Sequence, residues 1–136
     1  MSGGITGTDM PTIREKQAHF TEMVAKLIIK ANLIGTPVVV LEWYRDIERQ
    51  KYLVSIGRSK TINSKHILGL AVDLCFIDDL RDDGQMNWAA DKYRHLGIYW
   101  ESLDNKNRWG GSFGVTPQDK EQGKFGWDAP HFEYNG

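Results

Sequence analysis

Two short stretches of the sequence carry imidazoles beside carboxylates. His66 lies seven residues before Asp73, and His131 follows Asp128 by three residues and precedes Glu133 by two. A catalytic zinc site takes three protein ligands from such groups and leaves one position open for water. Nickel or cobalt could bind the same set of donors. These residues predict a metal site, provided that the fold brings the two stretches together.

The spacing of His66 and Asp73 constrains how they can meet. On an ideal strand, an odd separation places two side chains on opposite faces. A helix would place both on one face, but Gly69 and the β-branched residues that follow disfavour a helix. The two side chains can converge only if the backbone bends between them, and Gly69 is the residue that permits a bend.

The two stretches form a longer pattern, Ser-x-His-x-x-Gly-x-Ala-x-Asp followed far downstream by acid-x-x-His. This pattern resembles the zinc peptidases of the D-alanyl-D-alanine carboxypeptidase family. The resemblance extends from about Val38 to Tyr134, with weaker matches at Tyr44-Arg45, at Gln50 and over residues 57–60. The positions that match the two motifs are Ser64, His66, Gly69, Ala71 and Asp73, then Asp128 and His131.

The resemblance implies a role for each matched residue. His66, Asp73 and His131 would be the zinc ligands, and Asp128 would be the catalytic acid and base. The carboxypeptidase and dipeptidase branches usually carry Glu where this chain has Asp128. The Asp form is similar to the L-alanyl-D-glutamate endopeptidases that phages use as endolysins.

Two further residues receive roles from the same resemblance. Arg45 would be the cation that steadies the oxyanion or a substrate carboxylate, and Ser64 would hydrogen-bond the substrate near the metal. Glu133 shares a strand face with His131, so it is either a rival base or a residue that supports the ligand.

Each of these residues also has an ordinary structural interpretation. Asp128 could simply start a turn before Pro130, because Asp commonly does so. Arg45 could form an ordinary ion pair, and Ser64 could cap a local turn. The two histidines and Asp73 could also be an unrelated set of structural polar residues.

The expected function is a zinc-dependent peptidoglycan hydrolase that cleaves the L-alanyl-D-glutamate bond of the stem peptide. One alternative is a D-Ala-D-Ala carboxypeptidase or dipeptidase on the same scaffold. Another is a zinc-bearing binding module without catalysis, as in the signalling domain of hedgehog proteins, which resembles this family. The expected partner is the stem peptide and the expected cofactor is Zn²⁺.

The helices and strands expected around these residues indicate an α+β fold, with a small, mainly antiparallel sheet and helices packed on one side. Helices are expected over 12–35, 46–57 and 88–97, where Thr12 and Asp46 would cap the first two. Strands are expected over 36–43, within 66–78, at 98–100 and 108–109, and over 129–134. The first of these strands, 36–43, reads as buried. Residues 110–126 read as a long loop and residues 1–10 as mobile. Trp109 and Trp127 flank this loop and read as core residues, with a wall that faces a sugar or a peptide as the alternative.

Composition excludes several classes of protein. The chain has 136 residues and a formal net charge of −1, which argues against a nucleic acid or an anionic membrane as partner. No apolar run approaches the roughly 20 residues that span a bilayer. We expect one zinc peptidase domain over 1–136, monomeric, made in the host cytoplasm and released to the cell wall by a separate factor. The single cysteine, Cys75, reads as a buried apolar residue.

Overall fold

The computed structural model describes residues 10–79 and 90–136. A four-stranded antiparallel sheet has the order β1-β2-β4-β3. The strands are β1 (Val38–Glu42), β2 (Ala71–Phe76), β3 (Asn107–Trp109) and β4 (His131–Tyr134). The helices are α1 (Ile13–Leu33), α2 (Ile47–Ser55), α3 (Arg94–Leu103) and α4 (Pro117–Glu121), with short 3-10 turns at Ile77–Asp79, Ala90–Tyr93 and Gly110–Ser112.

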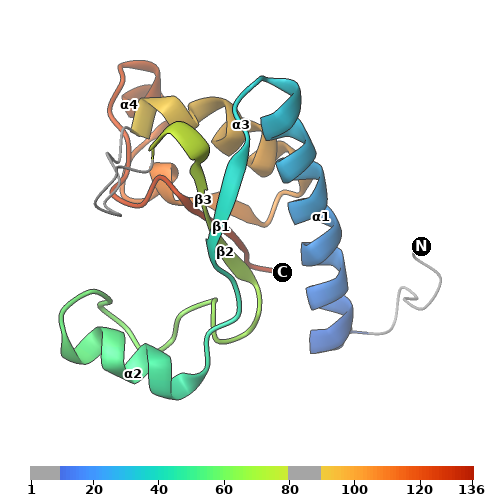
Figure 1. Cartoon of the computed structure of the whole chain (residues 1–136), viewed down its shortest axis with the longest axis vertical. Coiled ribbons are helices and arrows are strands. Elements are labelled where there is room, and N and C mark those ends of the chain that lie inside the picture. Colours follow the sequence, from blue (N-terminus) through green and yellow to red (C-terminus); the bar gives the residue numbers. More distant parts are fainter. Residues whose placement is uncertain (1–9, 80–89) are drawn as a thin grey trace.

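Helices α1 and α3 pack on one face of the sheet, whereas α2 lies apart from them beyond one end of the sheet (Figure 1). This arrangement confirms the α+β expectation. Residues 1–9, for which mobility was expected, and 88–89, where the third helix was expected to begin, lie outside the described residues. None of the described helices is long and apolar enough to cross a bilayer.

The first helix is set by its cap and by its apolar stripe. The Thr12 side chain accepts from the Glu15 amide while the Glu15 carboxylate accepts from the Thr12 amide, as the sequence predicted. Phe20, Val24 and Leu27 are fully buried on one side of α1. The Phe20 ring packs edge-on against Trp100 of α3, so α1 and α3 form one apolar layer against the sheet.

The alternation of side chains along β2 and β4 separates the core from the site. Val72 and Leu74 of β2 and Phe132 of β4 belong to the core beneath the helices. Because successive strand residues point to opposite faces, Asp73 and His131 point to the other face of the sheet. The period-two pattern therefore places polar side chains together on the face that the helices leave uncovered.

The third helix differs from the expectation. It continues through Gly97 to Leu103, where the sequence predicted an end at Gly97 and a strand over 98–100. A Cβ at Gly97 would overlap the Trp109 ring. Gly97 is therefore a site of close packing inside the helix and not a stop.

The segment 110–126 is more ordered than predicted. It contains the 3-10 turn Gly110–Ser112 and helix α4, which Thr116 caps together with Asp119. Trp109 is buried as expected, but Trp127 is 73% exposed. Cys75 is buried, as the sequence predicted.

Strand β1 is not buried as predicted, because it lies at the edge of the sheet. Its central residues Val39, Val40 and Leu41 are 36–47% exposed. Its β-branched composition predicted a strand correctly, but composition does not show whether a strand lies in the centre of a sheet or at its edge. Helix α2 follows β1 and begins at the Asp46 cap, which accepts from the Arg49 amide.

Candidate metal centre and active site

Three neighbouring strands place acidic and imidazole side chains in one row. In the register of the sheet, Asp73 of β2 lies opposite Glu42 of β1 on one side and His131 of β4 on the other. Residues paired directly across antiparallel strands point to the same face. The strand pairing alone therefore brings Asp73 and His131, which are 58 residues apart, into contact.

His66 reaches this row from the turn that precedes β2. The Ser64 hydroxyl accepts from the His66 amide, and the Gly69 amide donates to the His66 carbonyl. Gly69 has a φ of +69°, a left-handed conformation that favours glycine. The bend that the spacing required is thus present, and it lies at the predicted residue.

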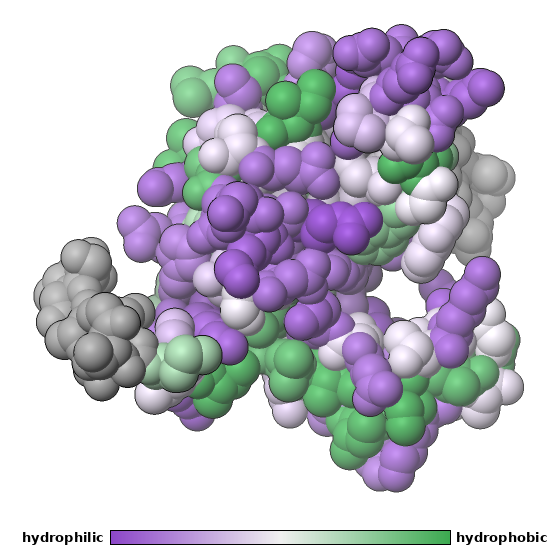
Figure 2. Space-filling model, turned by 180° about the vertical axis from the view of Figure 1, so that it is seen from behind, coloured by the Kyte–Doolittle hydropathy of each residue, from purple (hydrophilic) through white to green (hydrophobic). Residues whose placement is uncertain are grey.

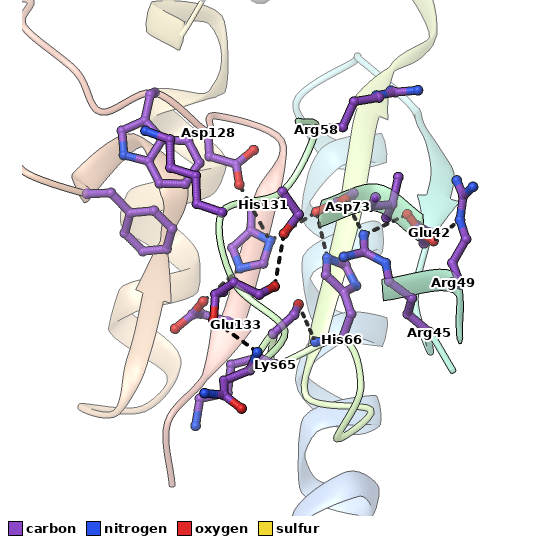
Figure 3. Close-up of a pocket in the computed structure, with 18 of the residues that line it drawn as sticks. Glu42, Arg45, Arg49, Arg58, Lys65, His66, Asp73, Asp128, His131 and Glu133 are labelled. Carbon is purple, nitrogen blue, oxygen red and sulfur yellow. Dashed lines mark hydrogen bonds and ion pairs between the residues drawn. The ribbon is translucent and has the colours of Figure 1, made fainter. Parts of the chain in front are cut away.

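His66, Asp73 and His131 form the candidate metal centre. One ligand atom from each lies within 4.8 Å of the other two. His66 Nε2 is 3.2 Å from Asp73 Oδ1, and His131 Nδ1 is 3.0 Å from the same oxygen. Figure 3 shows the three side chains converging from the turn, β2 and β4.

The far nitrogen of His66 fixes which atom faces the cluster. His66 Nδ1 is 2.7 Å from the carbonyl oxygen of Trp43, which can only accept. The ring therefore carries a proton on Nδ1, and in its neutral form Nε2 has a bare lone pair aimed at Asp73.

His131 repeats this arrangement with its nitrogens exchanged. His131 Nε2 lies 2.7 Å from Glu133 Oε1, so this nitrogen donates to the carboxylate. In the neutral ring, Nδ1 is then bare and faces Asp73. A histidine that donates its outer N–H to a carboxylate is the usual arrangement of a metal ligand.

These donors fit a divalent cation. When both rings are neutral, the two nitrogens and the carboxylate oxygen that converge are all hydrogen-bond acceptors and no donor lies between them. A cation would satisfy all three. Without one, the site must take up a proton. Burial alone would lower the pKa of His131, but its hydrogen bonds with Asp73 and Glu133 raise it to about 10. Burial raises the pKa of Asp73, but bonds from His131 and His66 hold it well below its usual range.

Asp128 lies beside the cluster. Its Oδ2 is 3.8 Å from His131 Nδ1, and its side chain is one third exposed. Burial raises the pKa of Asp128, the nearby charge of His131 lowers it, and the Asp73 carboxylate raises it. Asp128 is thus a carboxyl that takes up a proton more readily than usual, next to a nitrogen of a candidate ligand.

Glycines bring the Asp128 backbone close to the sheet. A Cβ at Gly110 would overlap the Asp128 carbonyl, and one at Gly126 would press on the backbone of Gly110 and Phe113. Gly110 was not among the residues expected at the site. Its signal, a Gly-Gly pair directly after a strand, is common in ordinary turns.

Arg45 lies at the edge of the cluster and is nearly buried. Its two terminal nitrogens donate to Gln50 Oε1 at 2.6 Å and to Glu42 Oε2 at 2.7 Å. The nitrogen that donates to Glu42, Nη2, is also 3.9 Å from Asp73 Oδ2. Within the described residues its Nε–H is buried without a partner. Arg45 therefore forms the ion pair of the ordinary interpretation, with its charge beside the cluster.

A cavity of about 690 Å³ opens over the cluster. Figure 2 shows a hollow between the lobe that contains α2 and the rest of the molecule, edged by hydrophilic residues. Ser64, Asp128 and Glu133 line it together with the three candidate ligands. The structure thus brings every site residue proposed from the sequence to one cleft.

Other residues of this cleft were not found from the sequence. Glu42 holds both Arg45 and Arg49. Phe113 packs against His131 and Trp127, with ring centroids 5.7 and 5.6 Å apart. An isolated aromatic in a glycine-rich segment carries no sequence signal for a cleft wall, whereas the spacing of Glu42 and Arg45 at i and i+3 is a weak signal for a pair.

Solved peptidoglycan peptidases share this fold. The L-Ala D-Glu endopeptidase ChiX of Serratia marcescens is 24% identical, with a TM-score of 0.61, over 90% of this chain and 83% of its own. The vancomycin-resistance D,D-pentapeptidase VanY, in complex with Zn(II), is 20% identical with a TM-score of 0.52, over 87% of this chain and 71% of its own. The LD-carboxypeptidase LdcB is 15% identical with a TM-score of 0.56, over 96% of this chain and 64% of its own.

The fold implied by the sequence motifs is therefore confirmed: it is the fold of these peptidases. No protein-family model and no curated protein matches the chain. The similarity shown thus lies in the arrangement of the elements.

Proposed function

We propose that this protein is a zinc-dependent peptidoglycan peptidase of the endolysin kind, which cleaves the L-alanyl-D-glutamate bond of the stem peptide. One observation carries the proposal: two imidazole lone pairs and the Asp73 carboxylate converge beside Asp128, on the floor of an open cleft. The similarity to ChiX, an L-Ala D-Glu endopeptidase, supports the choice of bond.

The proposed metal ligands are His66 through Nε2, His131 through Nδ1 and the Asp73 carboxylate. Zinc held there supplies a Lewis acid that lowers the pKa of a water toward about 7. Glu133 keeps the His131 ring in the tautomer that binds the metal. Glu133 is committed to His131, which favours Asp128 over Glu133 as the base.

Asp128 is the proposed acid and base. It takes the proton from the water as the water attacks the amide carbon, and it then passes this proton to the leaving amine. Its raised pKa suits a group that must hold a proton between these two steps. Asp is shorter than Glu, and the close approach of Gly110 to the Asp128 backbone compensates for the missing methylene.

Arg45 and Ser64 have proposed supporting roles. Arg45 Nη2 lies 3.9 Å from the second oxygen of Asp73, and we propose that the charge of this guanidinium steadies the oxyanion or a substrate carboxylate. The Ser64 oxygen accepts from the His66 amide, which leaves its O–H free to donate to the substrate. The protein is proposed to act as a monomer.

The second candidate is a D-Ala-D-Ala carboxypeptidase or dipeptidase, because VanY has the same fold and VanYB was solved in complex with D-alanine-D-alanine. Mass spectrometry of digested cell wall separates the two. Stem peptides that begin at D-Glu support the endopeptidase, and free D-Ala or the D-Ala-D-Ala dipeptide supports the alternative.

The test of the mechanism is Asp128→Asn. We expect this variant to bind zinc with unchanged stoichiometry and to lose peptidoglycan hydrolysis by roughly 100-fold or more, because general acid–base catalysis contributes on that scale. Hydrolysis at the wild-type rate with zinc bound would refute the assignment of Asp128. Bound zinc with no hydrolysis by the wild-type protein would instead indicate a binding module.

A further inference from the structure

The cleft contains more positive charge than its own carboxylates use. Arg45 and Arg49 both pair with Glu42. Three more cations line the cavity, namely Arg58, Lys60 and Lys65, and none of them pairs with a carboxylate among residues 10–79 and 90–136 within 4.0 Å. An anionic part of the substrate would find its counter-charge among these three residues.

Lys60 contacts the residue that precedes the proposed acid. Its Nζ lies 5.7 Å from the centroid of the ring of Trp127, the residue directly before Asp128 in sequence. Lys60, Trp127 and Asp128 all line the same cavity, and Lys60 and Trp127 belong to segments far apart in the sequence. Cation–π attraction holds an ammonium at a defined place but leaves its hydrogen-bond donors free.

The other two cations are less well placed. In Figure 3 the Arg58 side chain runs away from Asp128 and His131. Lys65 lies beside Glu133, and its charge contributes to the lowered pKa of that carboxyl. Lys60 is the cation that contacts the sequence neighbour of Asp128 and pairs with no carboxylate in the described part of the chain.

The bond proposed for cleavage lies next to a carboxylate of the substrate. In the stem peptide D-Glu is linked onward through its γ-carboxyl, so its α-carboxylate is free, on the carbon that bears the scissile nitrogen. Asp128 must reach that nitrogen to protonate it. The α-carboxylate therefore comes to lie near Asp128, where two negative charges repel each other unless a cation stands between them.

We propose that Lys60 binds the α-carboxylate of the D-glutamyl residue and that the protein therefore prefers stem peptides in which this group is not amidated. Trp127 is the positioning residue that holds the Lys60 ammonium. This inference rests on the proposed function and deepens it, because it specifies the form of the substrate.

The experiment compares two synthetic peptides, L-Ala-γ-D-Glu-L-Lys and the same peptide with the α-carboxylate converted to an amide. We expect wild-type protein to favour the carboxylate peptide by roughly three- to tenfold in kcat/KM, the range of one partly exposed ion pair. The preference should lie in KM, because the charge pair is present before and during the reaction.

Variants of Lys60 then test the residue. Lys60→Met should bring the ratio of the two kcat/KM values close to one, Lys60→Arg should retain the preference, and Lys60→Glu should reverse it. The matched control is Lys26→Met, an exposed lysine of α1 outside the cleft, whose ratio should equal that of wild type. Bound zinc is measured in each variant to exclude a damaged metal centre.

Two results would overturn the inference. One is a wild-type protein that cleaves both peptides equally well, and the other is a Lys60→Glu variant that keeps the wild-type preference. A wild-type protein with bound zinc that cleaves neither peptide after L-Ala would refute the proposed function, and the assignment of Lys60 would fail with it.

Discussion

Two oxygens outside the cluster decide which nitrogen each histidine offers to a metal. The Trp43 carbonyl holds His66 through Nδ1, and the Glu133 carboxylate holds His131 through Nε2. The two ligands therefore use different nitrogens. The ligand residues could be predicted from the motif, but these atoms could not, because they depend on where β1 and β4 place the two oxygens.

Glu133 should control metal affinity. Glu133→Ala removes the acceptor for His131 Nε2–H, so the ring loses its preferred tautomer and part of its basicity. We expect zinc to bind roughly 10- to 100-fold more weakly, the usual effect of losing such a partner. Competition with a chromophoric chelator measures this. Glu133→Gln keeps an acceptor oxygen and should lose less affinity, so equal losses for the two variants would contradict this explanation.

Metal binding should depend on pH through His131. In the metal-free protein the pKa of this ring is raised to about 10, so the ring is protonated at neutral pH. A metal ligand must be neutral, so zinc has to displace this proton. Apparent zinc affinity should therefore rise by about tenfold per pH unit between pH 6.5 and 8.

Calorimetry in buffers of different ionisation enthalpy checks this directly, because it counts the protons released. About one proton per zinc is expected at pH 7.5. Release of no proton would show that His131 is already neutral in the metal-free protein.

At the scale of the elements, close backbone packing positions Asp128. The segment 126–128 rests on the turn Gly110–Ser112, and its strand neighbour β4 carries His131. The Gly126 amide donates to the Gly111 carbonyl at 2.7 Å. The acid and one ligand are therefore aligned by backbone contacts that leave no room for side chains.

Gly110→Ala should therefore impair catalysis as well as stability. The added Cβ would overlap the Asp128 carbonyl, and the segment must move. We expect a loss of about 1–3 kcal/mol in the free energy of unfolding, the range for overpacking, together with a fall in kcat.

The matched control is Gly123→Ala, which has a positive φ of +79° but open space around the site. It should cost about 1–2 kcal/mol, the penalty for a left-handed non-glycine residue, with kcat unchanged. Denaturant titration and steady-state kinetics distinguish the two. Equal kcat values for the two variants would argue against a positioning role for the Gly110 turn.

The elements could largely be predicted where local signals were strong. The caps at Thr12 and Asp46 predicted their helices correctly, and β2 lies within 66–78, where a strand was expected. Gly97 was misread because a glycine that ends a helix and one that packs against a tryptophan look alike in sequence. The exposure of β1 and Trp127 depends on what lies beside them in space, which no local pattern records.

At the scale of the whole molecule, the candidate metal joins parts of the chain that are otherwise linked weakly. His66 comes from the turn next to the α2 lobe, whereas Asp73 and His131 belong to the sheet. A ligand that binds only the folded state stabilises it by an amount that rises with the logarithm of the ligand concentration over its dissociation constant.

Zinc should therefore raise the melting temperature. At free zinc of 100 times the dissociation constant the gain is about 2.7 kcal/mol, which corresponds to roughly 5–15 °C for a domain of this size. Scanning calorimetry with zinc and with a chelator measures the difference. His66→Ala should abolish the shift, and a shift that persists in this variant would place the stabilising metal elsewhere.

The α2 lobe is attached mainly by polar groups. Its buried side chains are Gln50 and Leu53, and Gln50 joins Arg45 to the Ser59 hydroxyl and the Thr61 carbonyl. Such a segment opens at lower free energy than an apolar core. On warming in chelator, amides of α2 should exchange with deuterium while those of α1 remain protected. Heat inactivation would then begin as a reversible local detachment, and brief cooling with fresh zinc should restore the proposed hydrolytic activity.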